Sequence, residues 1–354
     1  MYKRQGKNNF ISVQAEDELA AVGMAIGANW NGARGFTATS GPGISLMSEF
    51  LGLAYFAEVP LVIFNIQRGG PSTGMPTRTQ QSDILSCAYA SHGDTKHVLL
   101  FPEDPQECFE FSAEAFNLAE RLQTPVFVIS DLDIGMNDWV TDKFEWDDEQ
   151  KYDRGKVLKA EDLDKMDNFG RYLDVDDDGI CYRTYPGTHP EKGAFFTRGT
   201  SHDEYARYTE NGDINEQTLT RLVKKFRTAS ELVPDPIINL SEKQGSSGVI
   251  FYGSTSAAMY EAKDILNENN IEVDLMRIRS FPFNLDVWEF IENHDLIYVI
   301  EQNRDSQMRT LIMAEGGISA EKLRSLVWFN GDPIQAKFIA KKIYERESQQ
   351  ALIT

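Results

Sequence analysis

The sequence is poor in cysteine and histidine and contains no long hydrophobic run. Its three cysteines, Cys87, Cys108 and Cys181, are too far apart for a Cys-x-x-Cys motif, which excludes a zinc ribbon or an iron–sulfur cluster held by this chain alone. The five histidines show neither zinc-site spacing nor the order of a hydrolytic triad. No stretch approaches the roughly 20 apolar residues of a membrane span, and the N-terminus MYKRQGKNNF lacks the apolar core of a signal peptide. We expect a cytoplasmic protein with no metal site of its own.

Positive charge is also scarce. The chain has 35 Lys and Arg against 55 Asp and Glu, which gives a formal net charge of −20. This excess is repelled by phosphate backbones and anionic membranes, so nucleic acid and membrane partners are not expected. A hydrophobic content of 41% and a length of 354 residues are typical of a packed protein with about two domains, each large enough to bury a core.

The sequence pattern divides the chain into three parts. Residues 1–138 alternate short apolar runs with amphipathic segments, which predicts strands at 10–14, 35–39, 61–67, 97–100 and 126–131 and helices at 17–30, 44–56, 80–91 and 105–121. Residues 139–236 form an acidic, mostly irregular insertion with one helix near 217–228. Residues 237–354 return to alternation, with strands at 248–252, 271–278, 296–301 and 323–328 and helices at 256–269, 284–294, 306–314 and 333–346. The fold class is therefore α/β, with two parallel-sheet domains joined by the insertion.

Two candidate sites follow the predicted strands of the first domain. Glu16 lies at the carboxyl end of the first strand, where open α/β sheets place ligands; the alternative is a favourable negative charge at a helix start. The segment Thr39-Ser40-Gly41-Pro42-Gly43 offers glycines for a tight turn and free N–H groups for an anion, or forms an ordinary strand-to-helix turn. It matches neither the phosphate loop nor the dinucleotide loop.

Arg68 is the third candidate, since it directly follows the apolar strand 61–67. It precedes the glycine-rich loop Gly69-Gly70-Pro71-Ser72-Thr73-Gly74. An arginine in this position is suited to a bidentate pair with a substrate carboxylate, and the alternative is a structural salt bridge. The acidic run 174–179 resembles the start of an EF-hand loop, but Tyr185 occupies the position that requires a glutamate, so we interpret it as a solvated turn.

Taken together, these motifs resemble those of a known family. They include Gln14-Ala15-Glu16-Asp17-Glu18, the 39–43 and 67–74 segments, Gln81-Ser82-Asp83, Gly187-Thr188, Glu301-Gln302-Asn303-Arg304 and Asn330-Gly331. In this order they resemble the alpha subunit of the 2-oxoacid:ferredoxin oxidoreductases, most closely the 2-oxoglutarate type, over nearly the whole chain. The resemblance implies that the first domain binds the pyrimidine half of thiamine diphosphate and that the second is transketolase C-terminal-like.

The resemblance also implies roles for single residues. Glu16 matches the glutamate that hydrogen-bonds N1′ of the aminopyrimidine and so assists removal of the C2 proton, and Arg68 matches the arginine that holds the substrate carboxylate. We expect further cofactor contacts from the two glycine-containing segments, namely Thr39, Ser40, Gly41, Gly43, Gly69, Gly70, Ser72 and Thr73. The implied partner is a beta subunit that holds Mg²⁺, the diphosphate and a 4Fe-4S cluster, with ferredoxin as electron acceptor and coenzyme A as acyl acceptor.

Two departures from the family pattern leave alternatives open. The sequence has no Tyr-Pro-Ile-Thr-Pro-like segment, and the first strand and helix of the pyrimidine domain are not found, so we expect an N-terminally truncated chain. The Gly-Asp-Gly…Asn motif for Mg²⁺ and diphosphate is missing as well. The alternatives are a subunit of a non-redox thiamine diphosphate enzyme and a non-catalytic scaffold of the same complex.

Overall fold

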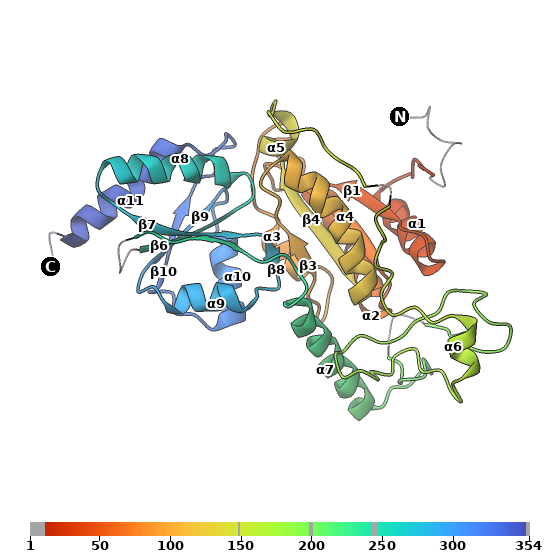
Figure 1. The fold of residues 1–354 in the computed structure, drawn as a ribbon. Coiled ribbons are helices and arrows are strands. Elements are labelled where there is room, and N and C mark those ends of the chain that lie inside the picture. The colour runs from red at the N-terminus through yellow and green to blue at the C-terminus, as the bar shows by residue number, and fades with distance from the viewer. Residues whose placement is uncertain (1–10, 148, 198–200, 243–246, 352–354) are drawn as a thin grey trace.

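The computed structural model describes residues 11–147, 149–197, 201–242 and 247–351, and contains two sheets that lie beside each other (Figure 1). The first sheet has the strand order β1 (Phe36–Thr39), β2 (Leu61–Gln67), β4 (Pro125–Asp131), β3 (Val98–Leu100), β8 (Ser280–Phe281). The second has the order β10 (Leu323–Val327), β9 (Ile297–Glu301), β6 (Ser247–Tyr252), β7 (Val273–Ile278), β5 (Ile237–Asn239). All pairings are parallel except those of β8 and β5, which are antiparallel. The predicted α/β fold class is confirmed.

The helices follow the strands in the alternating order that the sequence predicts. Around the first sheet lie α1 (Glu18–Trp30), α2 (Gly41–Phe56), α3 (Ile84–Ala88), α4 (Pro105–Leu122) and α5 (Leu132–Met136). The middle segment contains α6 (Ala160–Asp164) and α7 (Gly212–Ala229). The second sheet is accompanied by α8 (Thr255–Glu268), α9 (Leu285–Glu292), α10 (Gln307–Gly316) and α11 (Ala336–Ala351). No helix in these ranges is long and apolar enough to cross a bilayer.

Helix α4 illustrates how local sequence determines an element. Asp104 accepts a hydrogen bond from the backbone N–H of Glu107 at 2.7 Å, and Pro105 occupies the first helical position, where a missing N–H costs nothing. Phe111, Ala115, Leu118 and Leu122 recur at helical spacing and are buried. They pack in one core cluster with Val126 and Val128 of β4, so this helix covers one face of the first sheet.

The two sheets share a core. One cluster of buried apolar residues includes Met47 of α2, Phe101 after β3, Phe281 of β8 and Ile250 of β6. The backbone N–H of Phe101 also donates to the carbonyl of Arg279 at 2.8 Å, next to the antiparallel pairing of β3 with β8. The side chains between the sheets therefore fix how the carboxyl ends of the first sheet face the second.

Several predicted elements need correction. The predicted strand at 10–14 is wrong over Ile11–Gln14, which forms no strand and leaves Ile11 84% and Val13 63% exposed, while Phe10 lies outside the described residues. An apolar run becomes a strand only where it joins the hydrogen-bond ladder of a sheet, and Ile11–Gln14 joins neither of the two sheets of the described residues. The predicted helix 80–91 is also too long, because only Ile84–Ala88 is helical. The short elements α5, α6, β5 and β8 were not predicted.

Candidate functional site

The candidate residues gather at the carboxyl ends of β1, β2 and β4. In the parallel register Thr39 is opposite Asn65, and Gln67 is opposite Asp131, so these strands end at one edge of the first sheet. This edge is where open α/β sheets bind ligands. The predicted position of Arg68, directly after β2, is confirmed.

The turn after β1 packs too tightly for side chains at its glycines. A Cβ added to Gly43 would lie 1.9 Å from Thr39 Oγ1 and 2.9 Å from Glu18 Cγ. A Cβ at Gly41 would lie 2.8 Å from Asp83 Oδ1. The turn therefore brings the start of α1, the end of β1 and the 81–83 segment into contact. Ser40 is the N-cap residue of α2 and makes no side-chain capping bond.

Asp83 is a member of this site to which the sequence analysis assigned no role. Asn65 Nδ2 donates to its Oδ2 at 3.1 Å, and its own backbone N–H donates to Gln67 Oε1 at 2.9 Å. Burial raises the pKa of the Asp83 carboxyl above its usual value, against the opposing effects of the Asn65 hydrogen bond and the Arg68 charge. Asp83 thus lies close enough to Arg68 for their charges to interact. The only sequence signal was its place in the Gln81-Ser82-Asp83 motif.

Arg68 is partly buried and retains unused donor capacity. Its Nε has no hydrogen-bond partner in the described structure although it is shielded from solvent. Arg68 forms no ion pair at 4.0 Å or less with any described residue, although its charge interacts with that of Asp83, and its role stays a prediction. A buried guanidinium N–H without an acceptor is costly unless a ligand supplies one.

The glycine-rich loop after Arg68 folds back on itself. The backbone N–H of Met75 donates to the carbonyl of Gly69 at 2.8 Å, and the N–H of Gly70 donates to Gln80 Oε1 at 3.1 Å. Ser72 adopts a positive φ of 58°, and both it and Thr73 are exposed. The structure therefore places Ser72 and Thr73 at the surface of the loop, and Gly69 in its buried stem.

The far end of this loop is attached to the second half of the chain. Arg78 Nη1 pairs with Asp332 Oδ1 at 2.9 Å, and the N–H of Thr79 donates to the carbonyl of Gly331 at 3.2 Å. A Cβ on Gly331, whose φ is +89°, would lie 2.8 Å from Met75 Cε. The Asn330-Gly331 motif therefore positions the loop that carries Gly69 to Thr73.

Glu16 lies just before α1 with an exposed side chain. The next residue, Asp17, is the N-cap of α1 and accepts from the N–H of Ala20 at 2.8 Å. Glu18, two residues after Glu16, is the residue whose Cγ packs near Thr39 and Gly43. Glu16 therefore lies two residues before Glu18, the residue that packs on the turn after β1, and no hydrogen bond or ion pair between Glu16 and Arg68 is found among the described residues.

A buried polar network behind the site joins the two sheets, and the sequence analysis missed it. Ser254 Oγ donates to Asp131 Oδ2 at 2.6 Å, and Gln302 Nε2 donates to Ser254 Oγ at 3.0 Å. The N–H of Gln81 donates to the carbonyl of Gln302 at 2.8 Å. Burial raises the pKa of the Asp131 carboxyl, while hydrogen bonds from Ser254 and Gln81 oppose the rise. This network holds the 81–83 segment, and hence Asp83, in place.

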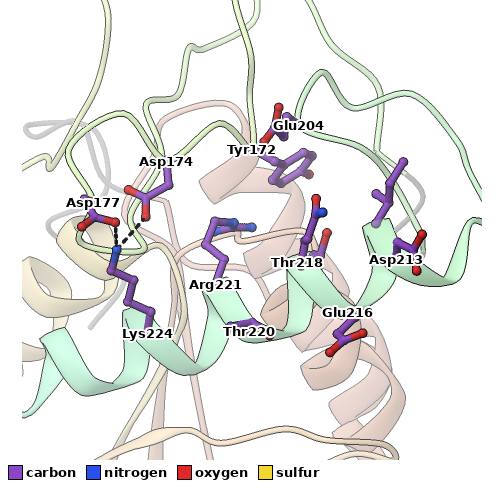
Figure 2. Close-up of a pocket in the computed structure, with 12 residues that line it drawn as sticks. Tyr172, Asp174, Asp177, Glu204, Asp213, Glu216, Thr218, Thr220, Arg221 and Lys224 are labelled. Carbon is purple, nitrogen blue, oxygen red and sulfur yellow. Dashed lines mark hydrogen bonds and ion pairs between the residues drawn. The ribbon is translucent and has the colours of Figure 1, made fainter.

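The larger cavities lie away from this edge. One of about 620 Å³ lies over α7 (Figure 2), lined mainly by polar and charged side chains. Its cations are already paired, Arg221 with Glu58 and Lys224 with Asp174 and Asp177. Another of about 720 Å³ lies between Tyr89, Phe226 and Trp288. Neither contains a predicted site residue, so we base the functional argument on the strand ends.

Comparison with known proteins gives matches over most of the chain. Residues 1–228 match the family described as pyruvate flavodoxin/ferredoxin oxidoreductase, thiamine diphosphate-binding. Subunit alpha of 2-oxoacid:ferredoxin oxidoreductase 2 from Aeropyrum pernix is 33% identical over 351 residues, which are 97% of this chain and 53% of that protein. The 2-oxoglutarate synthase subunit KorA of Methanothermobacter thermautotrophicus is 35% identical over 304 residues, 83% of this chain and 76% of that protein.

A solved structure has the same fold. The 2-oxoglutarate:ferredoxin oxidoreductase from Magnetococcus marinus, with 2-oxoglutarate, coenzyme A and succinyl-CoA bound, superposes with a TM-score of 0.84 at 28% identity, covering 94% of this chain and 56% of that one. The chain spans about half the length of several of its curated relatives. The resemblance predicted from the motifs is confirmed, and the chain belongs to the family of 2-oxoacid:ferredoxin oxidoreductase alpha subunits.

Proposed function

We propose that this chain is the catalytic alpha subunit of a 2-oxoacid:ferredoxin oxidoreductase that converts 2-oxoglutarate to its acyl-CoA and passes the electrons to ferredoxin. A beta subunit would complete the site and hold Mg²⁺, the diphosphate and a 4Fe-4S cluster. One observation supports this proposal most. Arg68, whose Nε has no partner among the described residues, and the tightly packed turn after β1 lie at the same edge of the first sheet. The names of the relatives favour 2-oxoglutarate. A cytoplasmic location remains a prediction.

The residues at this edge fit thiamine diphosphate. Gly41 and Gly43 stand where a Cβ would collide with neighbouring side chains, so only glycine lets the chain turn this closely from β1 into α2, and the N–H of Gly43 donates to the carbonyl of Ser40 at 2.9 Å. Glu16 presents an exposed carboxylate two residues before Glu18, which packs on that turn, as a site shared with a second subunit requires. When bound, the cofactor supplies the carbon nucleophile and electron sink on which a 2-oxoacid loses carbon dioxide.

Arg68 would bind and orient the carboxylate of the 2-oxoacid. Its guanidinium forms a planar fork that matches two carboxylate oxygens, and its free Nε gives it a donor that needs an acceptor. Asp83, held by Asn65 and Gln67, lies close enough for its charge to interact with that of Arg68 and would help to keep the guanidinium in position. Asp83 is in this account a positioning residue.

Glu16 would share a proton with N1′ of the aminopyrimidine. A carboxyl group in hydrogen-bond contact with that atom acts as a general acid and base, which typically contributes a rate factor of about 10²–10⁴. The N-cap Asp17 fixes the start of α1, so the backbone that carries Glu16 is held by the helix that follows it. The packing of Glu18 Cγ near Gly43 of the turn has the same effect.

The proposal is tested on the complex of this chain with its co-expressed beta subunit. Ferredoxin reduction and acyl-CoA formation are measured against a panel of 2-oxoacids, with 2-oxoglutarate expected to give the highest kcat/KM. Arg68→Lys keeps the charge but loses the fork, so KM for 2-oxoglutarate should rise about 10- to 100-fold, equivalent to roughly 1.5–3 kcal/mol. Arg324→Lys, at an exposed position of β10, is the control and should change nothing. Unaltered kinetics in Arg68→Lys would refute the substrate role.

A further inference from the structure

Cationic side chains outnumber carboxylates in a buried region between the first sheet and the 139–236 segment. Two carboxylates, Glu120 and Glu58, are 3% and 1% exposed. Six cationic side chains interact with them or lie close to them. These cations are Arg34, Arg154, Arg171, Arg183, Arg221 and Lys225. In a chain with a net charge of −20, such a local excess of positive charge needs an explanation.

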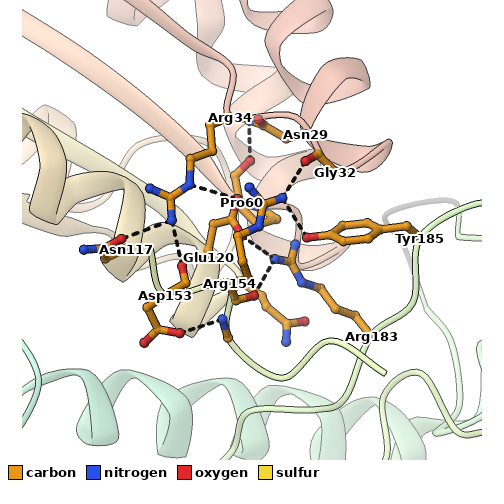
Figure 3. A network of polar contacts seen from close by, with 12 residues as sticks. Asn29, Gly32, Arg34, Pro60, Asn117, Glu120, Asp153, Arg154, Arg183 and Tyr185 are labelled. Atoms are coloured by element: carbon orange, nitrogen blue, oxygen red, sulfur yellow. Dashed lines mark hydrogen bonds and ion pairs between the residues drawn. The ribbon is translucent and has the colours of Figure 1, made fainter. Parts of the chain in front are cut away.

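Three of the guanidinium groups converge on Glu120 (Figure 3). Its carboxylate lies 2.9 Å from Arg154 Nε, 3.0 Å from Arg183 Nη2 and 3.6 Å from Arg34 Nε. One carboxylate cannot neutralise three cations. Asp153 also interacts with Arg34, and the Arg154 side chain is 37% exposed to solvent, but the group still carries more positive than negative charge.

The carboxylate of Glu58 does not neutralise these three arginines, because it is paired with two cations of α7. Arg221 Nη2 and Lys225 Nζ pair with its two oxygens at 2.5 and 2.8 Å. Arg171 reaches only the backbone carbonyl of Glu58, to which its Nη2 donates at 2.9 Å. Its guanidinium also packs on the rings of Tyr172 and Phe195, at 4.8 and 5.5 Å from their centroids.

A small cavity of about 20 Å³ lies between Arg171 and Arg183. The two residues are 2% and 4% exposed, and Nε and Nη1 of Arg171 and Nε of Arg183 have no hydrogen-bond partner in the described structure. The other polar groups at its wall are in use: Asn29 bonds to Gly35 and Pro60, Thr184 Oγ1 donates to the carbonyl of Gly193 at 2.6 Å, and the Tyr185 hydroxyl accepts from Arg154 Nη2 at 2.9 Å. Glu58 also lines the cavity, and its carboxylate is paired with Arg221 and Lys225. The free donors around the cavity therefore come from two cations.

We propose that this cavity is a binding site for a small monovalent inorganic anion of the chloride class, held by Arg171 and Arg183. The volume suits one occupant about the size of a water molecule, which excludes phosphate and organic acids. A water molecule would accept from these N–H groups but would leave the charge excess in place. A halide both accepts the hydrogen bonds and supplies the missing negative charge.

Bromide is the probe, because its anomalous X-ray scattering identifies it. Crystals of the full chain grown in sodium bromide should show an anomalous peak within hydrogen-bond distance of Arg171 and Arg183. The melting temperature should also rise with sodium bromide to a plateau, beyond the rise in sodium gluconate of equal ionic strength, because an anion that binds only the folded state stabilises it. The plateau should be lost in Arg171→Met and kept in the control Arg324→Met, at an exposed position.

Three results would overturn the proposal. The first is a cavity that contains density without anomalous signal, which identifies water. The second is an anomalous peak without any bromide-specific rise in melting temperature, which shows binding at crystal concentration only. The third is a bromide-specific rise that Arg171→Met retains. If Arg171→Met does not fold, the crystal and the wild-type titration still decide.

Discussion

Glu58 should be among the largest single contributors to the stability of this chain. It is a fully buried carboxylate, and it ties the first sheet to α7 through Arg221 and Lys225. Its φ of 55° lies in the left-handed region. Glu58→Gln keeps the volume of the side chain, and glutamine must adopt the same positive φ, so the substitution changes little besides the charge.

The expected loss of unfolding free energy depends on the hydrogen bonds that Arg221 and Lys225 keep in Glu58→Gln. Removing one partner of a buried ion pair typically costs about 3–5 kcal/mol, because the other charge is left uncompensated. Arg221 Nη1 still donates to the carbonyl of Gly179 at 3.0 Å, and Lys225 Nζ to that of Gln123 at 3.2 Å. We therefore expect the lower end of that range, about 3 kcal/mol, which is a large share of a typical total of about 5–15 kcal/mol.

The effect should depend on pH in a defined direction. Burial alone would raise the pKa of Glu58, but Arg221 and Lys225 hold it well below the ordinary value of 4.5. A carboxyl group whose pKa is lower in the folded state than in the unfolded state stabilises the folded protein. This stabilisation is complete above the pKa of the unfolded state and is lost as pH falls through the pKa of the folded state. The free energy of unfolding of the wild type should therefore exceed that of Glu58→Gln by a constant amount above about pH 5, and this difference should shrink below about pH 4.5.

Urea unfolding of the full chain measures this difference. The midpoint should fall in Glu58→Gln while the slope m stays the same. Glu321→Gln, at an exposed position before β10, is the matched control and should change the free energy of unfolding by less than about 0.5 kcal/mol. If Glu58→Gln were as stable as the control at pH 7, the account of the buried ion pairs would be wrong.

Two further predictions concern packing and pH. Gly43→Ala forces a Cβ against Thr39 Oγ1 and should lower the free energy of unfolding by about 1–3 kcal/mol. Gly27→Ala in α1, where nothing lies within 4 Å of the added Cβ, should raise it by about 1 kcal/mol. Urea unfolding of both variants measures the two changes. Burial lowers the pKa of His97 to about 4, so the chain should lose about 3 kcal/mol of stability between pH 6.5 and pH 4 as the unfolded state takes up the proton first. His97→Asn should remove that part of the pH dependence, and an unchanged slope would contradict the burial argument.

Hydrophobic pattern predicted the larger elements well, because their burial is periodic. The strand at Leu61–Gln67 has the bounds that its apolar run predicts, since this strand lies inside the sheet and is covered on both faces. The run at Ile11–Gln14 looks the same in sequence, but it is exposed and forms no strand in the described chain. The two-residue strand β8 depends on pairing with β3 nearly 180 residues earlier, which no local pattern indicates.

The candidate site was predictable only where a residue follows a strong strand. Arg68 was found because it comes directly after the apolar run 61–67, and the turn after β1 because its glycines follow a predicted strand. Asp83 and Asn65 were missed, because what distinguishes them is burial and contact with each other across 18 positions. The network of Asp131, Ser254 and Gln302 was missed for the same reason, as it forms only when the two sheets meet.

Exchange of the C2 proton of bound thiamine diphosphate tests the central proposal most directly. The measurement compares wild type with Glu16→Gln in the complex with the beta subunit, with thermal stability recorded in parallel. Glutamine keeps the size of the side chain but cannot share a proton with N1′, so exchange should slow by about 10²–10⁴-fold while the complex stays assembled. A Glu16→Gln complex that exchanges at the wild-type rate, and loses only about 0.3–1 kcal/mol of stability, would show that Glu16 is a helix-start charge and would contradict the proposed function.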